Sequence, residues 1–147
     1  MSNDVANEVA VDRTADRTAE KATSRGRVAD KILWVVQILV GLDFMFGAFM
    51  KLAGWPHMVE MFDHIGAGQW LRYFVGFCEL AGGIGLMIPA VASLAAMGLA
   101  LLMVGALYTN IFILDESLAP LLWLILAVVI AWRRWPRTKE FFTRRRH

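Results

Sequence analysis

The sequence has few of the residues on which most soluble enzymes rely for chemistry. Its single cysteine, Cys78, excludes an intramolecular disulfide and a CxxC thiol pair. Its three histidines lie outside the long apolar runs, which excludes an intramembrane haem held by histidine. It has neither a glycine-rich nucleotide loop in a strand–turn–helix context nor a nucleophile with a base beside it. We therefore expect no intrinsic metal or flavin cofactor.

Charge is scarce along the middle of the chain. Between residues 32 and 132 only two residues are basic, Lys51 and Arg72, whereas 58% of the 147 residues are hydrophobic. So much apolar surface would make a folded soluble protein insoluble. Seven of the 15 Lys and Arg residues follow residue 132, accompanied by Glu140 alone. We expect this basic tail to meet an anionic bilayer surface and not a nucleic acid.

The apolar runs predict an all-α polytopic membrane protein, a bundle of four transmembrane helices. The spans lie at about residues 32–52, 71–88, 94–114 and 118–132, within a membrane domain at residues 32–136. Residues 1–31 carry six acidic and six basic residues and are expected to be a disordered tail or a transient helix. Residues 137–147 form a basic tail. Residues 54–70 are too polar for burial, and the spacing of Met58, Phe62 and Ile65 predicts a short helix on the membrane surface.

The basic flanks give the orientation. Arg25, Arg27 and Lys31 precede the first span, and the basic tail follows the last one. Acidic residues dominate the connections that follow the first and the third span, which hold Glu60, Asp63, Asp115 and Glu116. The positive-inside rule therefore places both termini in the cytoplasm, in an inner-membrane protein that crosses four times.

The second span carries an ionisable carboxylate, Glu79, near its middle. At that depth a charge costs roughly 2.5–3.5 kcal/mol, so the side chain must face the bundle interior, pair, or stay protonated. Gly76 and Gly83 lie on the same side of the helix as Glu79 and predict close approach of another helix there. Gly98 and Gly105 form a second small-residue stripe in the third span.

Three segments, GAFMKLAG at 47–54, CELAGGIGL at 78–86 and GALYTN at 105–110, resemble the DoxX-like family in their order and spacing. The resemblance implies a four-helix membrane bundle. It also implies a link to quinol oxidation, to thiosulfate oxidation with quinone as acceptor, or to membrane complexes of redox stress. The family pattern carries over to Lys51 and Glu79. Relatives often have histidine where this chain has Asn110, and Asp43 is additional to the pattern.

Lys51 and Glu79 are the candidate site. Side chains tilt toward the N-terminus of their helix, which reduces the difference in depth between these two residues on antiparallel helices. One interpretation is an ion pair that only locks the bundle. The other is a polar pocket that holds a quinone headgroup or passes a proton.

Three further residues are candidate substrate-binding groups. Asp43 is either part of the polar pocket or a neutral carboxyl hydrogen-bonded to a backbone carbonyl or to Gln37. Asn110 and Tyr108 either donate hydrogen bonds to a ligand or join helices. His57, Glu60 and His64 share a face, but without a third strong ligand we expect a solvated face and no metal site.

Three functions remain open. The first is an accessory subunit of a membrane redox system that interacts with quinone and takes electrons from a partner redox protein; if it is an enzyme, it is a quinone-linked oxidoreductase subunit. The second is a membrane scaffold or assembly factor. The third is a small proton-coupled transporter, which would act as a homo-oligomer because four helices make a narrow pathway.

Overall fold

The computed structural model describes residues 2–114 and 118–144, and every secondary-structure element in these ranges is helical. The chain divides into two compact units, Met1–Val35 and Val36–His147. The prediction of an all-α protein is confirmed.

Helix α1 spans Ser2–Leu52 and runs through both units. In the first unit residues 5–28 are exposed, and threonine hydroxyls donate to carbonyls one turn back, as Thr18 Oγ1 does to the Thr14 oxygen at 2.8 Å. This segment, expected to be a disordered tail or a transient helix, is helical in the structure. In the second unit Val40, Phe44 and Ala48 recur every four residues and are buried, as expected for one face of a packed helix.

Helix α2, Pro56–Ile65, is the short helix expected in the first connection. A proline in its first turn needs no intrahelical N–H partner there, and Gly66 ends the helix with φ 76°, a conformation that favours glycine. Phe62 is the buried residue of this helix. Helix α3, Gln69–Met87, follows and buries a stripe that includes Gly76, Glu79 and Gly83.

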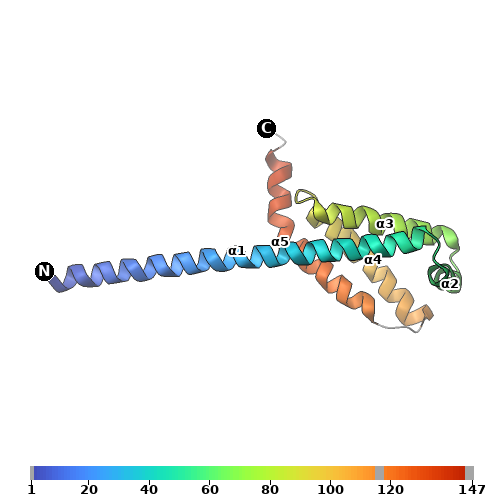
Figure 1. Cartoon of the computed structure of the whole chain (residues 1–147), viewed down its shortest axis with the longest axis horizontal. Coiled ribbons are helices and arrows are strands. Elements are labelled where there is room, and N and C mark those ends of the chain that lie inside the picture. The colour runs from blue at the N-terminus through green and yellow to red at the C-terminus, as the bar shows by residue number, and fades with distance from the viewer. Residues whose placement is uncertain (1, 115–117, 145–147) are drawn as a thin grey trace. The chain divides into compact units, whose positions relative to one another are not determined.

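Helix α4 spans Ala92–Thr109 and continues as a π-helical turn, η1, at Asn110–Leu114. Helix α5 spans Ala119–Arg144 and is longer than the predicted span because it continues past Pro136. A proline inside a helix removes one backbone hydrogen bond, and α5 changes direction in this region (Figure 1). The N-terminal end of α4 is joined to α5 by Ser93, whose Oγ donates to the Ala131 oxygen at 3.0 Å.

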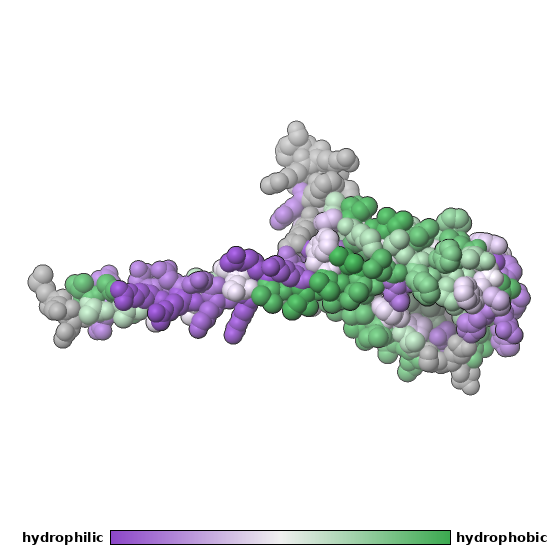
Figure 2. Space-filling model, in the orientation of Figure 1, coloured by the Kyte–Doolittle hydropathy of each residue, from purple (hydrophilic) through white to green (hydrophobic). Residues whose placement is uncertain are grey.

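Within residues 2–114 and 118–144, three helical stretches are long and apolar enough to cross a membrane: Val5–Leu52, Ala92–Leu114 and Ala119–Pro136. Figure 2 shows that hydrophobic residues cover most of the visible surface of the second unit, with hydrophilic residues gathered over α2. Such a surface, on helices of this length, is that of a multi-pass integral membrane protein. Helix α3 has 19 residues, which is long enough to cross a membrane, but it carries the charged residues Arg72 and Glu79 and is not one of these three stretches.

Glycines set the packing of α3 against α1. A β-carbon on Gly76 would lie 3.0 Å from Leu52 Cγ, and one on Gly83 would lie 2.8 Å from the Gly41 oxygen. The predicted close approach on the Glu79 side of the helix is therefore confirmed. The second predicted stripe is not used in this way: β-carbons on Gly98 and Gly105 would meet no atom within 4 Å in the described chain.

Candidate functional site

Lys51 and Glu79 form an ion pair between α1 and α3. Lys51 Nζ lies 2.9 Å from Glu79 Oε2, and the two side chains are 14% and 6% exposed. Lys51 occupies the last turn of α1, where the helix dipole carries partial negative charge, so its cation is also favoured by its own helix. The sequence predicted these two residues as one site, and the structure brings them together.

Small residues make room for the pair. A β-carbon on Gly47 would lie 3.6 Å from Glu79 Oε2 and 3.7 Å from Lys51 Nζ, so Gly47 borders the ion pair directly. On the facing helix, a β-carbon on Gly76 would lie 3.3 Å from Lys51 Cβ. Both helices thus present glycine beside the Lys51 side chain, which lets this long side chain lie between them.

Glu79 Oε2 is buried and lies 2.9 Å from Lys51 Nζ, which is the distance of a charge-assisted hydrogen bond. The described residues offer this oxygen no further partner. A buried carboxylate oxygen in this state is stabilised by charge but keeps its capacity to accept a hydrogen bond. Chemically, the arrangement can accept from a hydroxyl or exchange a proton with one.

A network of hydrogen bonds fixes the position of the Lys51 backbone. Arg72 on α3 is 4% exposed, and its Nη1 donates to the backbone oxygen of Lys51 at the C-terminus of α1. Arg72 Nε donates to Gln69 Oε1 at 2.6 Å, and Gln69 Nε2 donates to Asp63 Oδ1 at 2.6 Å. The network runs from α2 through α3 to the last turn of α1, so the backbone that carries Lys51 is held from both neighbouring helices.

Sequence reasoning missed the role of Arg72. The signal was present, because Arg72 is one of only two basic residues between residues 32 and 132. A cation near the end of an apolar helix was open to interpretation as an interfacial anchor, and its carbonyl partner is distant in sequence. A cation that caps another helix can be recognised only when the two helices are placed together.

A third polar cluster also escaped prediction. Gln37 Nε2 donates to the Leu86 oxygen, and Arg134 Nε donates to Gln37 Oε1 at 2.8 Å. Gln37 and Arg134 are 2% and 1% exposed. Gln37 was a candidate hydrogen-bond partner of Asp43, but its amide group is engaged by α3 and α5 instead.

Asp43 does not join the ion pair by contact. It is exposed on α1, although its charge is close enough to interact electrostatically with those of Lys51 and Glu79. Tyr108 is 59% exposed, and its ring packs at 4.9 Å from that of Phe112. Asn110 is half-buried at the start of η1, which packs against α2. Their predicted roles in ligand binding stay predictions.

The residues described by the structure contain no group of three or more His, Cys, Asp or Glu side chains placed to hold a metal ion. His57, Glu60 and His64 are exposed on α2.

Comparison with known proteins gives one result. The model of the DoxX-like family matches residues 35–132, which include α2, α3 and α4 together with Lys51 and Glu79. No curated protein and no solved structure matches the chain. The matched region covers most of the membrane-embedded helices and both residues of the ion pair, and the chain belongs to the DoxX-like family.

Proposed function

We propose that α3 is a fourth membrane-spanning helix and that both termini face the cytoplasm, in the inner membrane. Large apolar side chains of α3 are exposed where lipid would contact them, among them Phe74 at 55% and Phe77 at 62%. Its two charged side chains, Arg72 and Glu79, are instead buried within the protein. A helix with charges inside and apolar residues outside is stable in a bilayer despite its lower mean hydropathy. The basic flanks support the orientation.

We propose that the protein is an accessory subunit of a membrane redox system and that it binds quinone at Lys51 and Glu79. The observation that carries this proposal is the buried ion pair, in which Lys51 Nζ at 2.9 Å is the one partner of Glu79 Oε2 within the described chain, so the carboxylate keeps lone pairs that can accept from a ligand. A quinone headgroup has complementary chemistry: its carbonyls accept hydrogen bonds, and its reduced hydroxyls donate them. Family membership and the redox association implied by the resemblance support the same site.

In this proposal each side chain has a separate role. The Lys51 ammonium donates to a carbonyl of the oxidised headgroup, and the Glu79 carboxylate accepts from a hydroxyl of the reduced one. Reduction of a quinone takes up two electrons and two protons. A partner redox protein supplies both electrons and the solvent supplies both protons, one of which Glu79 takes up and passes to the headgroup. Tyr108 and Asn110 are accessory groups near the outer face, and Asp43 is an accessory carboxyl at the centre of the first span.

The test is the quinone content of the protein purified in mild detergent, measured by extraction and mass spectrometry. Near-stoichiometric quinone is expected in the unchanged protein and in Glu60→Gln, which alters an exposed carboxylate of α2. Glu79→Gln is expected to lose the quinone while it still inserts and purifies. Absence of quinone from the unchanged protein, or its full retention in Glu79→Gln, would contradict the proposal.

The second candidate is a scaffold whose ion pair only fixes the bundle. Its supporting observation is that Arg72 and the Lys51–Glu79 pair link the end of α1 directly to α3. In the scaffold function, the Lys51→Met, Glu79→Gln double variant keeps its association with partner proteins and therefore the activity of the redox system. In the quinone function, the same variant loses that activity. Activity of the membrane redox system, measured with and without the double variant, separates the two.

A further inference from the structure

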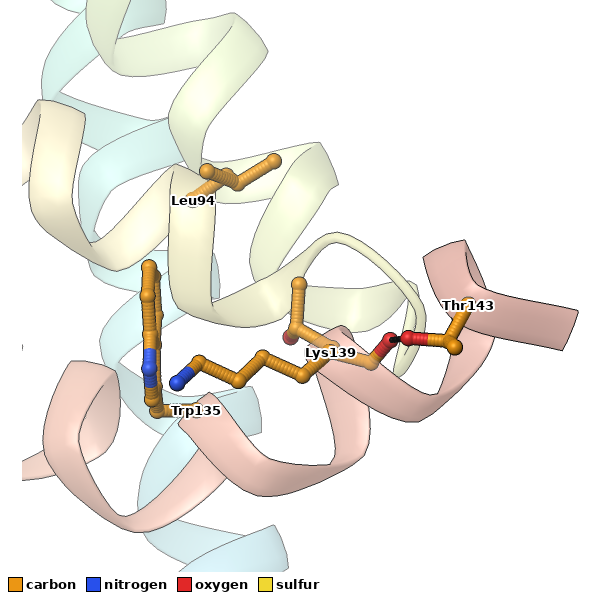
Figure 3. Close-up of a pocket in the computed structure, with 5 residues that line it drawn as sticks. Leu94, Trp135, Lys139 and Thr143 are labelled. Atoms are coloured by element: carbon orange, nitrogen blue, oxygen red, sulfur yellow. Dashed lines mark hydrogen bonds between the residues drawn. The ribbon is translucent and has the colours of Figure 1, made fainter. Parts of the chain in front are cut away.

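An open groove of about 270 Å³ lies between the start of α4 and the last part of α5. It is lined by Leu94, Trp135, Thr138, Lys139 and Thr143. Figure 3 shows Lys139 extending toward the Trp135 ring, with Leu94 on the facing helix. The lining of the groove shares no residue with the proposed quinone site.

The groove lies where two membrane spans end. The apolar stretch of α5 ends at Pro136, one residue after Trp135, and the apolar stretch of α4 begins at Ala92, two residues before Leu94. The hydrogen bond from Ser93 to the Ala131 oxygen holds these two ends together. Tryptophan is favoured at the level of lipid headgroups, so the groove crosses from the hydrocarbon at Leu94 to the headgroup layer at Lys139.

Lys139 is the charged hydrogen-bond donor that the groove offers to a ligand, beside the indole N–H of Trp135. Thr138 Oγ1 donates to the Arg134 oxygen at 3.4 Å, and Thr143 Oγ1 donates to the Lys139 oxygen at 2.8 Å, so both hydroxyl protons are used within α5. Lys139 Nζ lies 5.3 Å from the centre of the Trp135 ring and has no ion pair among the described residues. The groove therefore combines an apolar wall, an interfacial ring and an exposed ammonium, and it has no carboxylate in its lining.

We infer that this groove binds one anionic glycerophospholipid, with the phosphate of its headgroup on Lys139 Nζ and the start of an acyl chain along Leu94. Charge complementarity supports this occupant, because the segment from residue 133 onward holds seven Lys and Arg against one acidic residue, Glu140. Anionic lipids gather at the cytoplasmic leaflet, and basic pockets between helices on that side bind their headgroups. The Trp135 ring lies at the level of the glycerol backbone.

The test uses the full chain in mild detergent, titrated with phosphatidylglycerol or phosphatidylcholine and analysed by native mass spectrometry. We expect one phosphatidylglycerol to bind more tightly than phosphatidylcholine. Lys139→Gln is expected to weaken phosphatidylglycerol binding about fivefold, and Lys139→Arg to preserve it. Arg133→Gln is the matched control, because it removes an exposed cation of the same helix that does not line the groove.

Four results would overturn the inference. One is equal affinity for the two lipids, and another is unchanged phosphatidylglycerol affinity in Lys139→Gln. The third is an equal loss in Arg133→Gln, which would show a diffuse attraction to the basic tail. Soluble glycerol phosphate, added at the same concentrations, is expected not to displace the lipid; displacement would mean that the groove binds free phosphate. Because none of these measurements involves quinone, their failure is distinguishable from failure of the proposed function.

Discussion

A β-carbon on Gly83 of α3 would lie 2.8 Å from the carbonyl oxygen of Gly41 of α1, so these two glycines set how closely the helices approach. A carbonyl oxygen belongs to the backbone and cannot rotate away as a side chain can. The packing that places Lys51 beside Glu79 therefore depends on the absence of side chains at these positions.

Gly83→Ala is expected to destabilise the protein by about 1–3 kcal/mol, because one helix must move to admit the methyl group. The thermal unfolding midpoint in mild detergent measures the effect. Gly98→Ala is the control: its β-carbon would meet no atom within 4 Å, so we expect it to be neutral or to stabilise by about 0.4–1 kcal/mol. Equal midpoints for the two variants would show that the helices are not in close contact at Gly83.

The Lys51–Glu79 pair is expected to show strong coupling in a double-mutant cycle. Lys51→Met and Glu79→Gln each leave one buried group without its partner, and each should cost about 3–5 kcal/mol. The double variant removes both charges and should cost much less than the sum of the two. Unfolding midpoints of the three variants give the coupling energy, and additive losses would mean that the two side chains do not interact in the folded protein.

Arg72→Met is expected to loosen the C-terminal turn of α1. The substitution removes a charge-assisted hydrogen bond to the Lys51 oxygen, which is worth about 1.5–3 kcal/mol. Hydrogen exchange of the amides in the last turn of α1 should become faster, while exchange in α4 and α5 should not change. Arg133→Met, which alters an exposed cation, serves as the comparison, and the same exchange pattern in both variants would argue against a capping role.

The proposed orientation predicts which side of the membrane each exposed residue faces. In a Cys78→Ala background, a cysteine in place of His64 on α2 should react with a membrane-impermeant maleimide applied to the outer face of the membrane. A cysteine in place of Glu140 on α5 should react only after the membrane is permeabilised. The reverse pattern would invert the topology, and labelling of both sites from one side would mean that the number of spans between them is even.

Much of this architecture could be predicted from residue types and their periodicity. Apolar runs of sufficient length require helices in a membrane, because backbone groups must be satisfied internally there. The short α2 followed from the spacing of its apolar residues. The spacing of Gly76, Glu79 and Gly83 showed that they share one side of α3, and that side is buried against α1.

Other features depended on how the helices are placed. Periodicity shows which residues share a face, but not which neighbour that face meets. Asp43 lies about two turns before Lys51 and roughly 80° away around the helix, which was compatible with either burial or exposure. The crossing of α1 and α3 leaves it exposed while Lys51 faces Glu79.

The sequence by itself determined that this is a helical membrane protein resembling the DoxX-like family, and it predicted Lys51 and Glu79 as one site. The tertiary structure decided what holds that pair in place. Arg72 acts on a backbone oxygen of α1, and Gln37 links α3 to Arg134 of α5. Hydrogen bonds between residues so distant in sequence have no local pattern, because their geometry exists only after the helices have packed.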